Sequence, residues 1–227
     1  MPPIDLSHCR ILLTQADQFM GPALRTTLAE CGADVVADTR ALDAPEAAAA
    51  AVTAAGDIDV LLANLAVPAP STPAADVTDA EWRHVFAHMV DPLPRLLKAV
   101  LPQMQARGRG RFLVMGSASA LRGMKRTSSY SAARGAQLAW VQAVGVELAP
   151  LGIRVNAIAQ NFVENPTYFP PEVQAKPAFQ ERLKREVPLG RLVSAREDAL
   201  FAAYLCSDAA DCFVGQAFPI SGGWAVR

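Results

Sequence analysis

The sequence predicts an α/β protein built on a doubly wound parallel sheet with helices on both faces. Short apolar runs alternate with longer helical patterns along the whole chain, which is typical of parallel βαβ units. Neither an internal repeat nor a proline- and glycine-rich linker divides the chain. With 227 residues, about half of them hydrophobic, it is long enough to bury a sizeable core. We therefore expect one domain over residues 1–227.

Each expected element follows from local residue patterns. Runs of β-branched residues and leucine predict strands, and helical spacing of apolar residues predicts helices. The expected strands are Arg10–Thr14, Asp34–Asp38, Asp59–Ala63, Arg111–Gly116, Ile153–Ile158 and Ala217–Ile220. The expected helices are 21–32, 44–55, 79–106, 128–149 and 195–207. Residues 160–188 break the alternation, because they are rich in proline and aromatic residues before they become charged. We expect a loop insertion there that covers the catalytic edge of the sheet.

Charge and cysteine usage limit the possible partners. A net charge of -1 and a pI near 6.3 give no electrostatic reason to expect nucleic acid or a membrane as partner. The four cysteines form no CxxC pair, so a reduced cytoplasmic protein is expected. His84 and His88 lie one helical turn apart but lack an evident third ligand, so no metal site is expected. Three further charges are interpreted as solvated or helix-capping: Glu186, Arg191 and Asp198.

Three residues form a candidate catalytic set. Ser117 ends an expected buried strand, and Tyr130 and Arg134 lie one turn apart on the following helix, so their side chains share a face. Arg134 is always cationic and would favour the phenolate form of Tyr130, which then becomes a usable general base. Taken singly, Ser117 could merely close a turn and Tyr130 could be structural. The strand–turn–helix context of all three favours the catalytic interpretation.

Further motifs carry a family resemblance across nearly the whole chain: Asp59-Val-Leu-Leu-Ala-Asn64, Tyr130-Ser-Ala-Ala-Arg134, Gly152-Ile-Arg-Val-Asn-Ala157, Pro188-Leu-Gly-Arg191 and Ser221-Gly-Gly223. The sequence resembles the short-chain dehydrogenase/reductase superfamily and, within it, the halohydrin (haloalcohol) dehalogenases. The resemblance implies a Rossmann-like fold and cofactor-independent conversion of vicinal haloalcohols to epoxides, with release of halide and a proton. It also implies reverse epoxide opening by small anions such as azide, cyanide or nitrite, and a homotetramer formed through helices near 93–106 and 128–149.

Departures from the dehydrogenase pattern point to that branch. The glycine-rich fingerprint falls on residues 14–21, where Gln15 and Phe19 replace glycines that let a pyrophosphate approach the backbone. Arg134 takes the place of the lysine that dehydrogenases carry, and Met89 the place of their active-site asparagine. We therefore expect no nicotinamide cofactor.

The resemblance also implies a halide pocket in the vacated nicotinamide space. A halide needs uncharged donors and the positive edges of aromatic rings. The candidate halide- and substrate-binding residues are Phe19, Gln160, Asn161, Phe162, Tyr168 and Phe169. These aromatic residues could instead only fill core volume. A nicotinamide-dependent short-chain reductase with a degenerate fingerprint is the alternative function, and a catalytically silent scaffold is a third possibility.

Overall fold

The computed structural model describes residues 4–226, so residues 1–3 and Arg227 of the predicted domain lie outside the described residues. It confirms the predicted fold class, because one parallel sheet runs through the molecule in the order β2-β1-β3-β4-β5-β6. The strands are β1 (Arg10–Leu13), β2 (Asp34–Ala37), β3 (Val60–Asn64), β4 (Gly110–Ser117), β5 (Ile153–Gln160) and β6 (Ala217–Ile220). Every predicted strand is present, with ends displaced by at most two residues.

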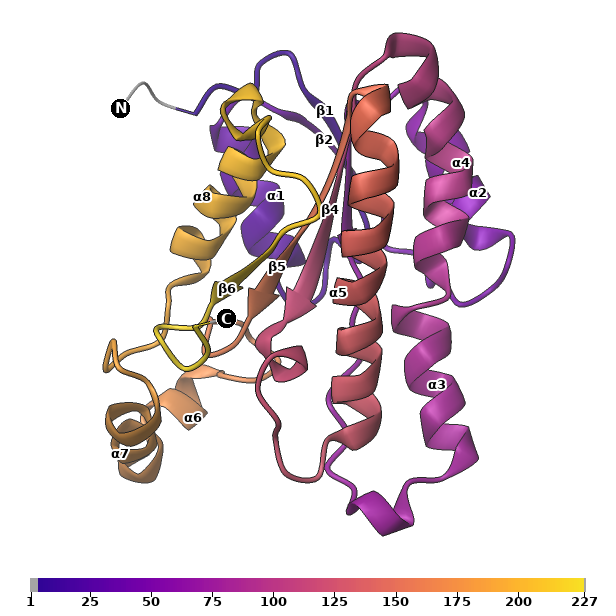
Figure 1. The fold of residues 1–227 in the computed structure, drawn as a ribbon. Coiled ribbons are helices and arrows are strands. Elements are labelled where there is room, and N and C mark those ends of the chain that lie inside the picture. The colour runs from indigo at the N-terminus through magenta and orange to yellow at the C-terminus, as the bar shows by residue number, and fades with distance from the viewer. Residues whose placement is uncertain (1–3, 227) are drawn as a thin grey trace.

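Helices cover both faces of this sheet (Figure 1). On one face α1 (Gly21–Glu30) packs beside α8 (Ala195–Cys206). The other face carries α2 (Ala47–Ala55), α4 (Pro92–Arg107) and α5 (Ser128–Leu148), with α3 (Asp79–Met89) beside α5. Strand residues alternate between the two cores, as Leu12 and Leu13 do on β1. The short helices are α6 (Pro171–Gln174), α7 (Pro177–Glu186), η1 (Ala74–Asp76), η2 (Ala118–Ala120), η3 (Ala149–Leu151) and η4 (Asp208–Ala210).

The single helix predicted over 79–106 is wrong. The structure divides this segment into α3, which ends at Met89, and α4, which begins at Pro92. The reason is proline chemistry, because Pro92 has no N–H to continue the helical hydrogen-bond ladder, although Asp91 before it keeps helical dihedral angles. Pro92 instead occupies the first turn of α4, where the missing donor costs nothing.

The carboxyl ends of β1 and β3 form the point where the sheet reverses its winding. The chain runs outward from β1 to β2 and then returns to place β3 on the other side of β1. Open α/β sheets bind ligands in the crevice at such a point. Helices α6 and α7 lie beyond the same ends of the strands (Figure 1). A candidate site is therefore expected between these ends and the 160–188 segment.

Two further features concern membrane-spanning helices and the cysteines. Across residues 4–226, none of the helices combines the length and apolar character that a membrane span requires. Cys9, Cys31, Cys206 and Cys212 are all free thiols, as the absence of a CxxC pair predicts.

Candidate active site

A cavity of about 320 Å³ opens at the carboxyl edge of the sheet. The wall comes from the ends of β4 and β5, the face of α5, the turn after β1, the segment after β5 and one side chain of α7. All the predicted site residues contribute to this one wall: Ser117, Tyr130, Arg134, Phe19, Gln160, Asn161, Phe162, Tyr168 and Phe169. The structure thus brings the predicted catalytic and pocket residues together.

Ser117 is fixed by its place at the end of a central strand. It is the last residue of β4, in extended conformation, and lies opposite Gln160 in the register of β4 and β5. Its hydroxyl oxygen accepts a hydrogen bond from the Ser119 backbone N–H at 3.2 Å, at the start of η2. The hydroxyl proton remains available to a substrate oxygen in the cavity.

Tyr130 and Arg134 are buried on the inner face of α5, with 6% and 4% of their surface exposed. The Arg134 guanidinium carbon lies 5.0 Å from the Tyr130 ring centroid. Arg134 Nη1 donates to the carbonyl oxygens of Leu65 at 3.1 Å and Met115 at 2.9 Å, and to Gln137 Oε1 at 2.9 Å. The arginine therefore ties α5 to the ends of β3 and β4, and a fixed cation lies over the ring of the tyrosine.

A second tyrosine lies against the first. The Tyr168 hydroxyl accepts a hydrogen bond from the Ala69 N–H at 3.0 Å and donates to the Val67 carbonyl at 3.3 Å. Burial raises the pKa of the Tyr168 phenol, and the neighbouring Tyr130 phenol raises that pKa further. Tyr168 therefore stays protonated near neutral pH, and its one hydroxyl proton is directed to the Val67 carbonyl.

The turn after β1 keeps the shape of a glycine-rich turn without its glycines. Gln15 and Phe19 both have left-handed backbone conformations, with φ of 44° and 50°. Asn64 Nδ2 holds this turn by donating to the carbonyls of Gln15 at 3.0 Å and Gln18 at 3.1 Å. A Cβ on Gly21 would lie 2.5 Å from the Gln15 carbonyl oxygen, so this glycine is needed for close approach.

The two replaced glycine positions differ in where their side chains go. The Gln15 amide turns to Ala66, donating to its carbonyl at 3.1 Å and accepting from its N–H at 2.8 Å. Phe19 turns into the cavity wall, where its ring centroid lies 6.0 Å from that of Tyr168. The predicted obstruction of a dinucleotide therefore comes from Phe19 and not from Gln15.

The two amides proposed for a halide differ in their contacts. Gln160 Nε2 donates to Asp198 Oδ2 at 2.5 Å. Asn161 Oδ1 accepts from the Phe162 N–H at 2.9 Å, and Asn161 Nδ2 faces the Met124 sulfur at 4.0 Å. Gln160 therefore uses one of its two N–H donors on Asp198, and Asn161 makes only a weak donor contact.

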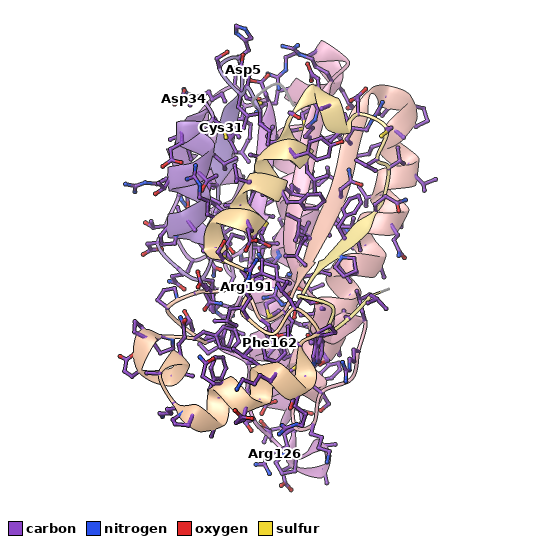
Figure 2. All side chains as sticks on the ribbon, turned by 90° about the vertical axis from the view of Figure 1, so that its left-hand side faces the viewer. Asp5, Cys31, Asp34, Arg126, Phe162 and Arg191 are labelled. Carbon is purple, nitrogen blue, oxygen red and sulfur yellow. The ribbon has the colours of Figure 1, made fainter. Side chains whose placement is uncertain are left out.

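Phe162 and Phe169 belong to a stack of aromatic rings. Phe162 is 2% exposed, with its ring centroid 5.9 Å from that of Phe169 and 6.1 Å from that of Trp224. It lies between the ends of the strands and the helices α6 and α7 (Figure 2). Phe162 therefore lines the cavity and also carries part of the core, which combines the two interpretations left open by its sequence.

Asp198 is the main correction to the sequence interpretation of charged residues. It is wholly buried in the first turn of α8, not solvated, and the capping role belongs to Ser194 and Glu197. Burial raises the pKa of Asp198 to about 7, partly offset by the hydrogen bond from Gln160. Its Oδ1 has no hydrogen-bond partner within the described part of the chain. A signal was present, since Asp198 shares a helix face with the buried Ala202 and Leu205.

Arg182 was also absent from the predicted site. It projects from α7 into the wall of the cavity, and its guanidinium carbon lies 5.2 Å from the centroid of the Phe162 ring. Its position on a short charged helix inside an irregular segment gave no sequence signal for this role.

Comparisons with known proteins identify a family whose named members are mostly reductases and dehydrogenases. A family model described as "Enoyl-(Acyl carrier protein) reductase" matches residues 7–225. The 2-keto-3-deoxy-L-fuconate dehydrogenase of Xanthomonas campestris is 31% identical over 99% of this chain and 82% of its own length. Dehydrogenase/reductase SDR family member 4 of Sus scrofa is 28% identical over 95% of this chain and 87% of its own length. A solved structure described as "Dehalogenation enzyme" is 34% identical, with a TM-score of 0.88, over 96% of this chain and 98% of its own.

These names contradict the predicted function, which was cofactor-independent dehalogenation of vicinal haloalcohols with reverse opening of epoxides. The family model and the relatives are named as reductases and dehydrogenases, which favours the alternative of a nicotinamide-dependent reductase. The geometry explains part of the error. Two bulky residues in the glycine turn predicted a blocked cofactor site, but only Phe19 adds bulk to the cavity, because the Gln15 side chain turns to Ala66.

Proposed function

This chain belongs to the short-chain dehydrogenase/reductase superfamily, and from that premise we propose that its pocket interconverts a small secondary alcohol and the corresponding carbonyl compound. One observation carries the proposal. Ser117, Tyr130 and Arg134 converge on a single cavity at the point where the sheet reverses its winding, which is where this fold class binds its ligands.

The proposed proton transfer uses residues with fixed positions. The Ser117 hydroxyl donates to the substrate oxygen and orients it. In the reducing direction the Tyr130 phenol gives its proton to that oxygen, and in the oxidising direction the phenolate takes the proton back. The Arg134 cation, whose guanidinium carbon lies 5.0 Å from the centroid of the Tyr130 ring, stabilises the phenolate.

Such a reaction needs a hydride carrier, which a nicotinamide dinucleotide supplies when bound. The turn after β1 has the required backbone shape, and Asp38 follows β2 at the position where dinucleotide folds place the acidic contact to a ribose. Asp38 is paired with Arg40 at 2.7 Å, and an arginine near this position suits a ribose phosphate. These residues fit the adenosine half of a dinucleotide, whereas the Phe19 ring in the cavity wall takes up space that the nicotinamide half would need.

The branch of the superfamily from which this chain descends is a separate question from the reaction that it catalyses. The likeness to the structure described as "Dehalogenation enzyme", together with Phe19 in the glycine turn, supports common descent with the halohydrin dehalogenase branch. Because related sites on one fold perform different reactions, we assign the reaction class from the reductase and dehydrogenase relatives.

The test mixes the purified protein with NADPH or NADH and a small neutral ketone, methyl levulinate, and follows oxidation of the nucleotide. We expect turnover in the wild type and its loss in Tyr130→Phe. A vicinal chloroalcohol without nucleotide serves as the opposing assay. Release of halide and protons in that assay, from protein that binds neither nucleotide, would overturn the proposal.

A further inference from the structure

We propose that the substrate of this pocket carries a carboxylate and that Arg182 on α7 binds it. The inference names the substrate class of the proposed alcohol–carbonyl reaction and rests on that function. It starts from the charges of the cavity wall. The ionised side chains there are Arg134 and Arg182, and the described residues place no acidic side chain in that wall.

The two arginines differ in how fully their donors are used. Arg134 is 4% exposed and its Nη1 is taken by two backbone carbonyls and Gln137. Arg182 uses its Nε to donate to Glu186 Oε2 at 3.0 Å. Both Nη groups of Arg182 lack a hydrogen-bond partner among residues 4–226, and the side chain is 44% exposed. These two groups form the fork that binds a carboxylate through two parallel hydrogen bonds.

The Arg182 side chain is held in place for this role. Phe179 and Leu183, its neighbours on α7, are 8% and 3% exposed and anchor the helix, with the Phe179 ring centroid 5.5 Å from that of Phe169. The guanidinium lies over the face of Phe162, and Glu186 fixes its Nε end. A guanidinium fixed on both sides loses less freedom when it binds a ligand.

Size and polarity agree with a small keto or hydroxy acid. A cavity of about 320 Å³ is at the small end of ligand sites, and its other walls are largely aromatic or aliphatic. Ser117 and Tyr130 would take the reacting oxygen at the ends of the strands, while Arg182 takes the carboxylate on the side of α7. A neutral substrate of the same shape would leave the Arg182 fork without a partner.

Arg185 provides a matched control on the same helix. It also pairs with Glu186, through Nη2 at 2.8 Å, but its side chain is 70% exposed and lies away from the cavity wall. Methionine keeps a straight apolar side chain in either position. Arg182→Met and Arg185→Met therefore remove the same charge and the same partner, and only the first removes the fork from the cavity.

The experiment measures binding of levulinate, a small keto acid, and of its neutral methyl ester by isothermal titration calorimetry. The wild type and Arg185→Met should bind levulinate with equal affinity. Arg182→Met should bind it about tenfold to a hundredfold more weakly, the usual loss for a charge-assisted pair of hydrogen bonds. The ester should bind all three proteins equally, and added salt should weaken only the levulinate complex.

Three results would overturn the inference: equal binding of levulinate to Arg182→Met and the wild type, an equal loss in Arg185→Met, or wild-type binding of levulinate no tighter than that of its ester. These outcomes do not depend on turnover. If levulinate binds through Arg182 but neither compound is reduced with either nucleotide, the proposed function fails while the carboxylate site stands. Thermal melts of both variants check that they fold.

Discussion

The frame of the pocket and its rim are built in different ways. The frame consists of β4 and α5, where Ser117, Tyr130 and Arg134 have ordinary strand or helix geometry. The side chains of Ser117 and Arg134 are also hydrogen-bonded to neighbouring backbone. The rim consists of the turn after β1 and the segment after β5, where Phe19 and Phe162 have left-handed conformations and short helices replace long ones.

This difference separates two kinds of information. Regular elements position the proton-transfer groups, so that chemistry follows from the sheet topology. Irregular segments supply Phe19, Arg182 and the aromatic stack, so that the choice of ligand depends on local conformation. Changes in the frame should therefore alter rate and stability, and changes in the rim should alter what binds.

The largest effect is expected from removing the reacting proton. Tyr130→Phe keeps the ring under Arg134 but should lower turnover about a thousandfold, the usual contribution of a positioned acid or base. Steady-state kinetics with methyl levulinate and nucleotide measure it. Tyr204→Phe, on α8, is the control and should keep full activity. Equal turnover by Tyr130→Phe and the wild type would show that another residue is the acid or base. No turnover by either protein would support a catalytically silent site.

Arg134→Met tests the hydrogen bonds that hold α5 to the sheet. The carbonyls of Leu65 and Met115 would lose a charged donor in a buried place, which should lower the free energy of unfolding by about 3 kcal/mol. Urea unfolding gives this value. The exposed Arg185→Met should change it by less than about 0.5 kcal/mol. A small change in Arg134→Met would show that these contacts do not fix α5.

Asp198 lies at the border between frame and rim, and its titration should make the stability of the protein depend on pH. Its folded pKa of about 7 lies above the ordinary 3.8, so the folded state holds a proton that the unfolded state has lost between these values. Stability from this group is fully present below pH 3.8 and is lost as pH rises through 7. Asp198→Asn keeps an acceptor for Gln160 and should remove roughly 2 kcal/mol of this loss between pH 5 and 8. Identical slopes in urea unfolding of both proteins would refute the buried titration.

The smallest effect concerns the rim. Phe19→Gly removes the ring from the cavity and relieves a left-handed conformation, so the affinity for NADPH should rise about tenfold. Fluorescence titration of the nucleotide measures it. Gln15→Gly is matched in backbone conformation, but its side chain faces Ala66, so no gain is expected. A gain in both variants would assign the effect to backbone freedom and not to the ring.

The sequence was most informative where residue patterns extend over whole elements. The strands and the positions of Ser117 and Tyr130 follow from the alternation and spacing of residues. The family resemblance added the prediction of the aromatic residues in the cavity wall. The single helix predicted over 79–106 is wrong because the helical spacing of apolar residues continues across Pro92, where the structure begins a new helix. The prediction that Asp198 is solvated was wrong because it relied on the charge and not on the position of Asp198 on an apolar helix face. Arg182 could not be predicted as a pocket residue because a short helix in a loop has no predictable direction.

The direction in which the Gln15 side chain turns is another feature that the sequence does not show. A sequence shows that a glycine has been replaced but not whether the new side chain enters a cavity or bonds to a neighbouring strand. That choice depends on the carbonyl and N–H of Ala66, which become adjacent only after β1 and β3 have paired.

The left-handed conformations of Gln15 and Phe19 also bear on how such a pocket can change over evolutionary time. The turn has kept a backbone path that suits glycine while carrying other residues, and Asn64 holds that path independently of both side chains. Glycine in place of Phe19 therefore needs a single substitution and no rebuilding of the fold. The depth of the pocket can thus change through one residue of this turn while the sheet stays the same.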